Sequence, residues 1–217
     1  MCIRDRSKTT CALGRDCILK QDGPSCSSSL RALAIWSGAL VGLLTILIGS
    51  LIPAAILLPA PPQVIDLPVS WQVPALLLCA MVSGPRAGVI ASVAYLTVGL
   101  GDLQVFQGGG GMAYVLEPGF GYLAGFVPAA WLTGRLAQQD GMGDVIKLSA
   151  SAVAGLIVLQ GCGLVNLLLG AALNRWDPSL LELLIQYSIG PLPGQLLLCI
   201  SAAVLAVVLR RLLVVDP

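Results

Sequence analysis

Histidine is absent from this 217-residue chain, and charged side chains make up only 11% of it. Without histidine, the chain lacks the commonest general base and a common zinc ligand. The hydrolase motif G-x-S-x-G and the metalloprotease motif H-E-x-x-H are missing too. The phosphate-binding motif G-x-x-x-x-G-K-[ST] is also absent, so ATP energy would have to come from another chain. We therefore expect neither an enzyme nor a bound cofactor or metal.

The shortage of charge also excludes an ordinary water-soluble domain, which carries about 25% charged residues. Here 57% of the residues are apolar and the mean hydropathy is +0.90. These values predict a protein whose solvent is the lipid bilayer. The net charge is +1, and no basic run with interleaved aromatics occurs, so we expect no nucleic acid partner. No ionisable residue is evident in the middle of an apolar run, which disfavours a self-sufficient ion-coupled carrier.

Residues 1–30 differ in composition from the rest of the chain. They are polar, rich in serine, and hold Cys2, Cys11, Cys17 and Cys26. The spacings do not match the C-x2-4-C pairs of structural zinc sites, and no secretory signal is apparent. We expect residues 1–30 to form a polar tail that is disordered or not native, and residues 31–215 to form the membrane domain.

Five apolar runs follow this tail. They cover Leu30–Leu58, Val73–Leu100, Tyr114–Leu136, Val145–Leu173 and Leu192–Val215. The second run is interrupted by Ser83-Gly84-Pro85-Arg86, so it is either one kinked span or two short ones.

The distribution of cations decides between five and six spans, because Lys and Arg favour cytoplasmic loops. With six spans and a cytoplasmic N-terminus, only Arg175 lies outside. The inner connections then hold Arg31, Arg86, Arg135, Lys147, Arg210 and Arg211. This pattern predicts an all-α integral membrane protein, a six-transmembrane-helix bundle with cytoplasmic N- and C-termini. The two halves of 73–100 are short for spans, since about 20 residues are needed to cross the hydrocarbon.

This topology brings three loops together on the outer face. They are Pro59–Trp71, Gly101–Pro118 and Asn174–Pro191. Irregular backbone at membrane depth usually lines a cavity, so these loops predict an outward pocket. Four amides fall beside span ends on this side, at Gln72, Gln104, Gln107 and Gln195. Each can donate and accept hydrogen bonds to a ligand, or simply cap a helix or be hydrated.

The first apolar run carries small residues at every fourth position, Ala34, Gly38 and Gly42. Such a stripe lets another helix approach closely. It predicts either a partner-binding surface or packing inside the bundle.

The ordered succession of these motifs resembles the BioY family. The resemblance covers about residues 31–213 and rests on Pro68-Val-Ser-Trp-Gln72, Ser83–Gly88, Tyr95, Gly99–Gly101, Val105-Phe106, Gly108–Gly111, Pro118–Phe126 and Pro193-Gly194. Members of this family are biotin-specific substrate-binding (S) components of energy-coupling factor (ECF) transporters.

The resemblance implies capture of biotin at the bacterial cytoplasmic membrane. Uptake would then require a transmembrane coupling subunit and two ATP-binding cassette ATPases, with Ala34, Gly38 and Gly42 contacting the coupling subunit. For biotin, the glutamines Gln72, Gln104, Gln107 and Gln195 are candidates to bind the ureido ring. Trp71, Phe106 and Tyr122 are candidates to enclose its apolar part. An interfacial belt is the alternative for the aromatics of the outer face, which are Trp71, Tyr114, Tyr122, Trp176 and Tyr187. Arg175 is the candidate partner of the carboxylate.

One departure from the family pattern concerns the start of the last helix. Many members have Pro-Gly-Asp-x-x-Lys there, with the Asp and Lys associated with ligand binding. In this chain Gln195 replaces the Asp and Leu198 replaces the Lys. Gln195 can still pair with a ureido group, but Leu198 cannot pair with a carboxylate. An S component for a different vitamin therefore stays the alternative, ahead of a stand-alone secondary carrier.

Overall fold

The computed structural model describes residues 24–59, 62–101, 105–106, 109–176 and 179–213, with side chains at 29–52 and from 69 onward within these ranges. Contacts divide the chain into residues 1–33 and 34–217. In the first unit, the described residues begin helix α1 (Pro24–Leu51), and residues 29–33 are exposed. The following description concerns residues 34–217.

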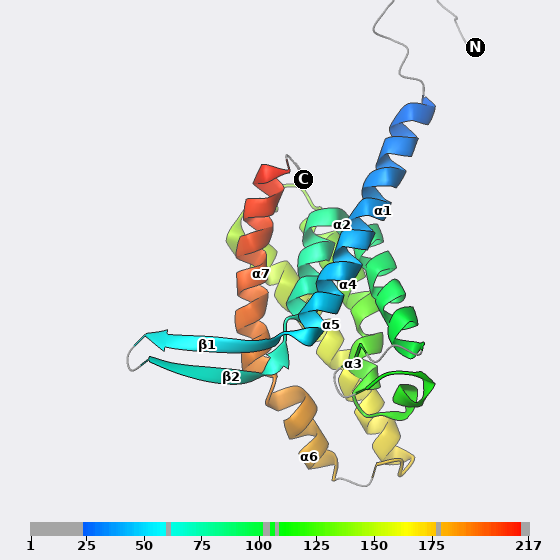
Figure 1. Cartoon of the computed structure of the whole chain (residues 1–217), viewed down its shortest axis with the longest axis vertical. Coiled ribbons are helices and arrows are strands. Elements are labelled where there is room, and N and C mark those ends of the chain that lie inside the picture. The colour runs from blue at the N-terminus through cyan, green and yellow to red at the C-terminus, as the bar shows by residue number, and fades with distance from the viewer. Residues whose placement is uncertain (1–23, 60–61, 102–104, 107–108, 177–178, 214–217) are drawn as a thin grey trace, which may run out of the picture. The chain divides into compact units, whose positions relative to one another are not determined.

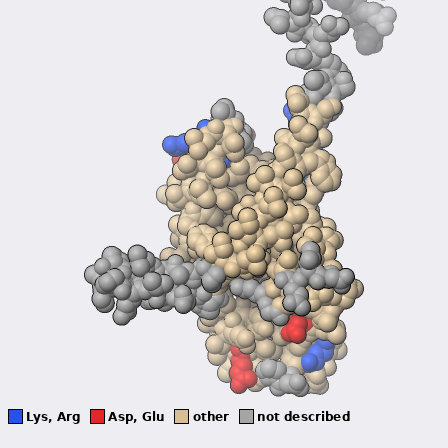
Figure 2. Space-filling model, in the orientation of Figure 1, with Lys and Arg blue, Asp and Glu red and all other residues tan. Residues whose placement is uncertain are grey.

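Helices dominate this second unit (Figure 1). After α1 come α2 (Gln72–Leu100), a short 3-10 helix (Met112–Leu116), α3 (Phe120–Ala124), α4 (Phe126–Ala137), α5 (Val145–Ala172), α6 (Leu180–Leu184), a π-helical turn (Ile185–Ile189) and α7 (Leu192–Leu212). Four described helical stretches have the length and apolar composition to cross a membrane: Ser29–Leu51, Gln72–Leu100, Val145–Ala172 and Leu180–Leu212. On the face shown in Figure 2, the coloured charged side chains lie towards the ends of the helices, and the described surface visible between them carries none.

Helix α2 folds back on itself at Gly84. In a straight helix, Gln72 and Tyr95 would lie about 35 Å apart, because each residue adds 1.5 Å. Instead, Gln72 Nε2 donates a hydrogen bond of 2.9 Å to Tyr95 Oη. Gly84 adopts a φ of 87° and a ψ of 175°, which a residue without a Cβ tolerates, and Pro85 then starts the second half. Of the two possibilities for the interruption at Ser83–Arg86, the structure shows a reversal, with halves at 72–83 and 85–100.

The prediction of a helix through Leu58 is wrong after Leu51. Strands β1 (Pro53–Pro59) and β2 (Pro62–Ser70) form an antiparallel hairpin, with Pro59 opposite Pro62 and Pro53 opposite Ser70. Pro53 has no amide hydrogen and its ring clashes with the preceding turn, so the helix ends before it. The hairpin also replaces part of the predicted Pro59–Trp71 loop, and the described fold is therefore helical apart from these two strands.

The predicted loop Asn174–Pro191 is helical over most of its second half. Ser179 Oγ accepts a hydrogen bond from the Glu182 amide, and the Ser179 amide donates to Glu182 Oε2 at 3.2 Å. This reciprocal capping box starts α6, and its S-x-x-E signature is visible in the sequence. Helix α7 begins at Leu192, as predicted, and α6 and the π-helical turn precede it where a loop was expected.

A buried arginine fastens one end of the bundle. Arg210 of α7 is 6% exposed and donates to Met81 O through Nε at 3.0 Å and Nη2 at 2.6 Å. Its Nη2 also donates to Ala137 O at 2.7 Å, and its Nη1 donates to Met142 O at 3.3 Å. Ala137 ends α4, and Met81 lies just before the break in α2. The last carbonyl groups of a helix have no backbone N–H partner within it, so both can accept from Arg210. Arg210, expected as a loop cation, thus joins three segments.

Candidate ligand-binding site

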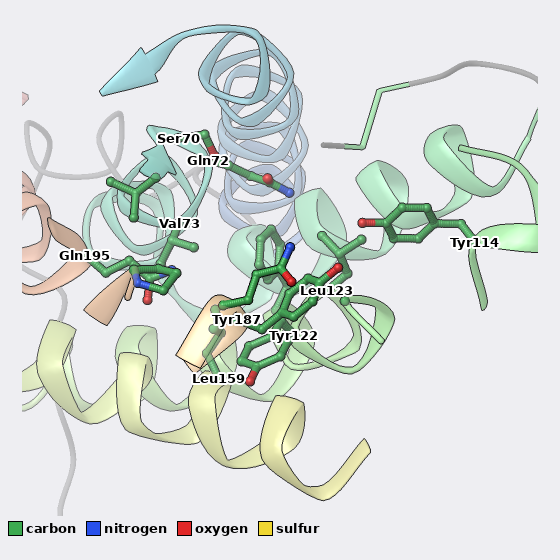
Figure 3. A pocket seen from close by; sticks show the side chains of 14 residues that line it. Ser70, Gln72, Val73, Tyr114, Tyr122, Leu123, Leu159, Tyr187 and Gln195 are labelled. Carbon is green, nitrogen blue, oxygen red and sulfur yellow. The ribbon is translucent and has the colours of Figure 1, made fainter. Parts of the chain in front are cut away.

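A cavity of about 330 Å³ lies among β2, the start of α2, α3, α5, the π-helical turn and α7 (Figure 3). Its volume is within the range of roughly 300–1,000 Å³ found for small-molecule sites. The described lining consists of Val69, Ser70, Gln72, Val73, Tyr114, Gly119, Tyr122, Leu123, Phe126, Leu159, Gln186, Tyr187, Pro191 and Gln195. Apolar walls with a few convergent amides and hydroxyls suit a compact, mostly apolar ligand with polar groups.

Hydrogen-bond chemistry fixes the orientation of the Gln72 amide. Tyr95 is fully buried, and its single hydroxyl hydrogen is donated to Val105 O at 3.0 Å. Tyr95 can therefore only accept from Gln72, which places Nε2 of that amide against it. Gln72, 5% exposed and lining the cavity, keeps Oε1 as the atom it can offer to a ligand. The cavity thus has an acceptor of fixed position.

A second amide, Gln195, lines the cavity from the first turn of α7. Its Oε1 accepts a hydrogen bond of 2.7 Å from Nε2 of Gln160, a residue in the middle of α5. Gln160 Oε1 is buried and has no hydrogen-bond partner among the described residues. An unpaired buried acceptor costs about 1–3 kcal/mol, so the amide pair is not an arrangement favoured by stability alone.

Three tyrosines give the cavity an aromatic wall. Tyr122 and Tyr187 stack with ring centroids 6.2 Å apart, and the Tyr122 hydroxyl is hydrogen bonded to Ser188. Tyr114 comes from the short 3-10 helix and packs on Phe106 with centroids 4.9 Å apart. Burial raises the pKa of Tyr114 to about 12, helped by the nearby Tyr187 and Glu117, so its phenol stays neutral near pH 7. The wall is polarisable but uncharged.

The structure brings three of the candidates, Gln72, Tyr122 and Gln195, together at this cavity, but not the others. Trp71 is 39% exposed and lines an apolar hollow with Ile48, Pro74 and Leu205 instead. Phe106 is 4% exposed and lies behind Tyr114, edge-on to Tyr95. Arg175 places its guanidinium 5.5 Å from the centre of the Trp176 ring and is not among the lining residues. Gln104 and Gln107 lie outside the described residues.

No Lys or Arg is among the described residues that line the cavity. Leu198, which stands where the family motif has Lys, is 7% exposed and packs against Val69, a lining residue. Leu198 therefore packs behind an apolar part of the cavity wall. Ser70, Gln186, Tyr187 and Gln195 are among the described lining residues that carry side-chain donors for an anionic ligand group.

Sequence reasoning missed several residues of the site. Tyr114 and Tyr187 were grouped with a membrane-interface belt, and Gln160 and Ser188 were not considered. Gln160 could have been noticed, since a lone amide in the middle of an apolar helix needs a buried partner. Nothing local in the sequence indicates that its partner is Gln195, 35 residues further on.

The small-residue stripe lies partly against α2. A Cβ on Gly38 would come 2.8 Å from Ser83, and one on Gly42 would overlap Cys79, whereas Ala34 is exposed. All three stripe residues also line an open apolar groove of about 710 Å³, bordered by α2 and by Leu209 and Leu213. The two glycines thus serve internal packing, and the groove beside them leaves a surface that a partner helix could contact.

The fold is that of an S-component. A crystal structure of the S-component for biotin from an ECF-type ABC transporter matches with a TM-score of 0.60 and 23% identity, covering 84% of this chain and 93% of that chain. With its long apolar helices, the chain is a multi-pass membrane protein.

The family follows from the sequence comparison. The BioY family model matches residues 26–214, so the chain belongs to the BioY family. It is 33% identical over 109 residues to the probable biotin transporter BioY of Lysinibacillus sphaericus, covering 50% of this chain and 55% of that protein. It is 28% identical over 146 residues to an uncharacterized 21.2 kDa protein of Cyanophora paradoxa, covering 67% of this chain and 75% of that protein. The resemblance seen in the sequence motifs is confirmed.

Proposed function

We propose that this protein captures biotin at the outer face of a bacterial cytoplasmic membrane, as the substrate-binding component of an ECF transporter. The main observation in support is the cavity. It is lined by the Gln72 acceptor, the Gln195 amide and an uncharged aromatic wall. Membership of the BioY family supports the same ligand.

The chemistry of biotin suits this arrangement. Its ureido ring has two N–H donors and one carbonyl acceptor, so a matching site must offer both kinds of partner. Gln72 Oε1 can accept from an N–H, and the Gln195 amide can meet the carbonyl. Tyr122 and Tyr187 can cover the sulfur ring, and the carboxylate would meet hydroxyl groups or water rather than a cation.

The proposed topology has six spans and cytoplasmic termini. The reversal at Gly84 gives α2 two antiparallel halves, so the helical units are α1, the two halves, α3 with α4, α5, and α6 with α7. The cavity contacts the end of β2 and the start of α7, whereas Arg210 lies near the other end of α7. In the proposed topology the cavity therefore opens at the outer face and Arg210 lies at the cytoplasmic end. Reporter fusions at both termini would test this arrangement.

Direct binding tests the proposed ligand. Full-length protein in detergent is expected to bind labelled biotin at equilibrium, and excess riboflavin, thiamine or lipoate is expected not to displace it. Gln195→Leu should weaken biotin binding tenfold or more, about 1.4 kcal/mol, because the amide contact is lost. Gln139→Leu, at an exposed turn, is the matched control and should bind normally. Displacement by another vitamin, or unchanged affinity in Gln195→Leu, would contradict the proposal.

A different vitamin is the second candidate ligand. It is favoured by Leu198, which removes the cation that the family motif places near the ligand, and by the absence of Lys and Arg from the described lining. The competition experiment separates the two candidates directly.

The proposed partners are a transmembrane coupling subunit and two ATP-binding cassette ATPases. We expect Ala34→Trp to reduce co-purification of the coupling subunit at least tenfold while biotin binding stays unchanged, because Ala34 is exposed in the groove beside Gly38. Leu44→Trp, exposed on α1 but not among the described groove residues, is the control. Gly38→Leu is unsuitable, since its side chain would displace Ser83. Normal complex formation by Ala34→Trp would remove this surface from the interface.

A further inference from the structure

A pair of hydrogen-bonded amides, Gln160 and Gln195, contributes one of its members to the cavity lining. Gln160 and Gln195 come from different helices, α5 and α7, and bind each other through one hydrogen bond of 2.7 Å. Only Gln195 is among the described lining residues. We propose that Gln160 is a positioning residue that holds Gln195 with its Nε2 towards the ligand, and so sets the donor character of this part of the site.

The orientation of the pair follows from the cost of its alternative. Rotating both amides by half a turn would preserve a hydrogen bond between them, with Gln195 as the donor. That rotation would move Gln160 Nε2 to the buried place where Oε1 now lies without a partner. A primary amide nitrogen brings two N–H groups, and buried N–H groups without acceptors are rarer than under-satisfied carbonyl oxygens. The observed orientation is therefore the favoured one.

This orientation makes the two glutamines of the cavity complementary. Gln72 is held by Tyr95 with its Oε1 available, whereas Gln195 is held by Gln160 with its Nε2 available. One fixed acceptor and one fixed donor match a ligand group that contains both an N–H and a carbonyl. The inference rests on the proposed function in that the ureido carbonyl of biotin is the group expected to meet Gln195.

The apolar, similarly sized substitution Gln160→Met tests this role. It removes the hydrogen bond and leaves Gln195 free to rotate. We measure binding of biotin and of 2-iminobiotin, which carries N–H donors where biotin has its carbonyl oxygen. Wild type should prefer biotin, and Gln160→Met should lower both the biotin affinity and this preference about tenfold. Gln139→Met, at an exposed turn, is the control.

A double-mutant cycle shows whether Gln160 acts through Gln195. In a Gln195→Met background, Gln160→Met should change biotin affinity by less than about twofold, because the group it orients is gone. Additive losses, or equal losses for the two ligands, would reduce Gln160 to a structural residue and overturn the proposal. Gln160→Asn, whose amide is one methylene shorter, replaces Gln160→Met if that variant does not fold. Wild-type protein that fails to bind biotin would refute the proposed function itself, whereas normal wild-type binding with unaffected Gln160 variants would refute only this inference.

Discussion

Gly163→Ala is expected to lower the affinity for biotin about a hundredfold while the protein stays folded. Gly163 is buried on α5, and the ring of Tyr122 lies directly over its Cα. An added methyl group would overlap three carbons of that ring, Cδ1, Cε1 and Cζ. Helix α3 packs closely on α5, since a Cβ on Gly125 would lie 3.0 Å from the Cβ of Cys162, and moving the whole helix away from α5 would lose this packing.

The Tyr122 ring must consequently move away from α5 towards the cavity that it lines. This movement would disturb both its stacking on Tyr187 and its hydrogen bond to Ser188. Overpacking of a close contact costs about 1–3 kcal/mol, and the upper part of that range corresponds to a hundredfold in binding.

Gly161→Ala is the matched control for this prediction. Gly161 lies two residues earlier on the same helix, is exposed, and has no atom within 4 Å of the place where its Cβ would be. Its replacement by alanine should leave binding unchanged and stabilise the helix by up to about 1 kcal/mol. Equilibrium binding, together with the thermal unfolding midpoint of both variants, distinguishes a lost site from a lost fold. Equal binding by both variants would show that the cavity does not hold biotin against Tyr122.

The sequence predicted the helical bundle more fully than its connections. Apolar runs and cation positions were sufficient for α5, for the start of α7, and for the reversal at Gly84, because burial and proline chemistry act locally. The β1–β2 hairpin was missed, since its pairing depends on a partner strand rather than on periodicity.

The candidate site, too, could be predicted only where the signal is local in the sequence. Gln72 and Gln195 stand next to helix ends, where polar residues are conspicuous in an apolar sequence. Phe106 and Arg175 looked equally suitable, yet Phe106 is packed behind Tyr114 and Arg175 lies over Trp176. Residue type and loop membership do not determine the direction of a side chain; packing between segments distant in sequence does.

Arg210 is the clearest case of a role that only tertiary structure shows, and it gives the second large expected effect. Arg210→Met should destabilise the protein by at least about 3 kcal/mol, because the carbonyls of Met81, Ala137 and Met142 lose charge-assisted hydrogen bonds together. No described Asp or Glu forms an ion pair with Arg210, so the substitution leaves no described carboxylate without its partner. The expected loss therefore arises from the three backbone carbonyls that are left without the guanidinium.

Arg211→Met provides the control, since Arg211 is the next residue, carries the same charge, and is exposed. It should change stability by less than about 0.5 kcal/mol. Arg210→Lys should recover only part of the loss, because one ammonium cannot reproduce the planar fork that reaches three carbonyls. Unfolding curves in detergent, monitored by tryptophan fluorescence, compare all three variants. If Arg210→Met and Arg211→Met unfold alike, the three carbonyls are satisfied without the guanidinium, and the end of α7 is held in the bundle by side-chain packing alone.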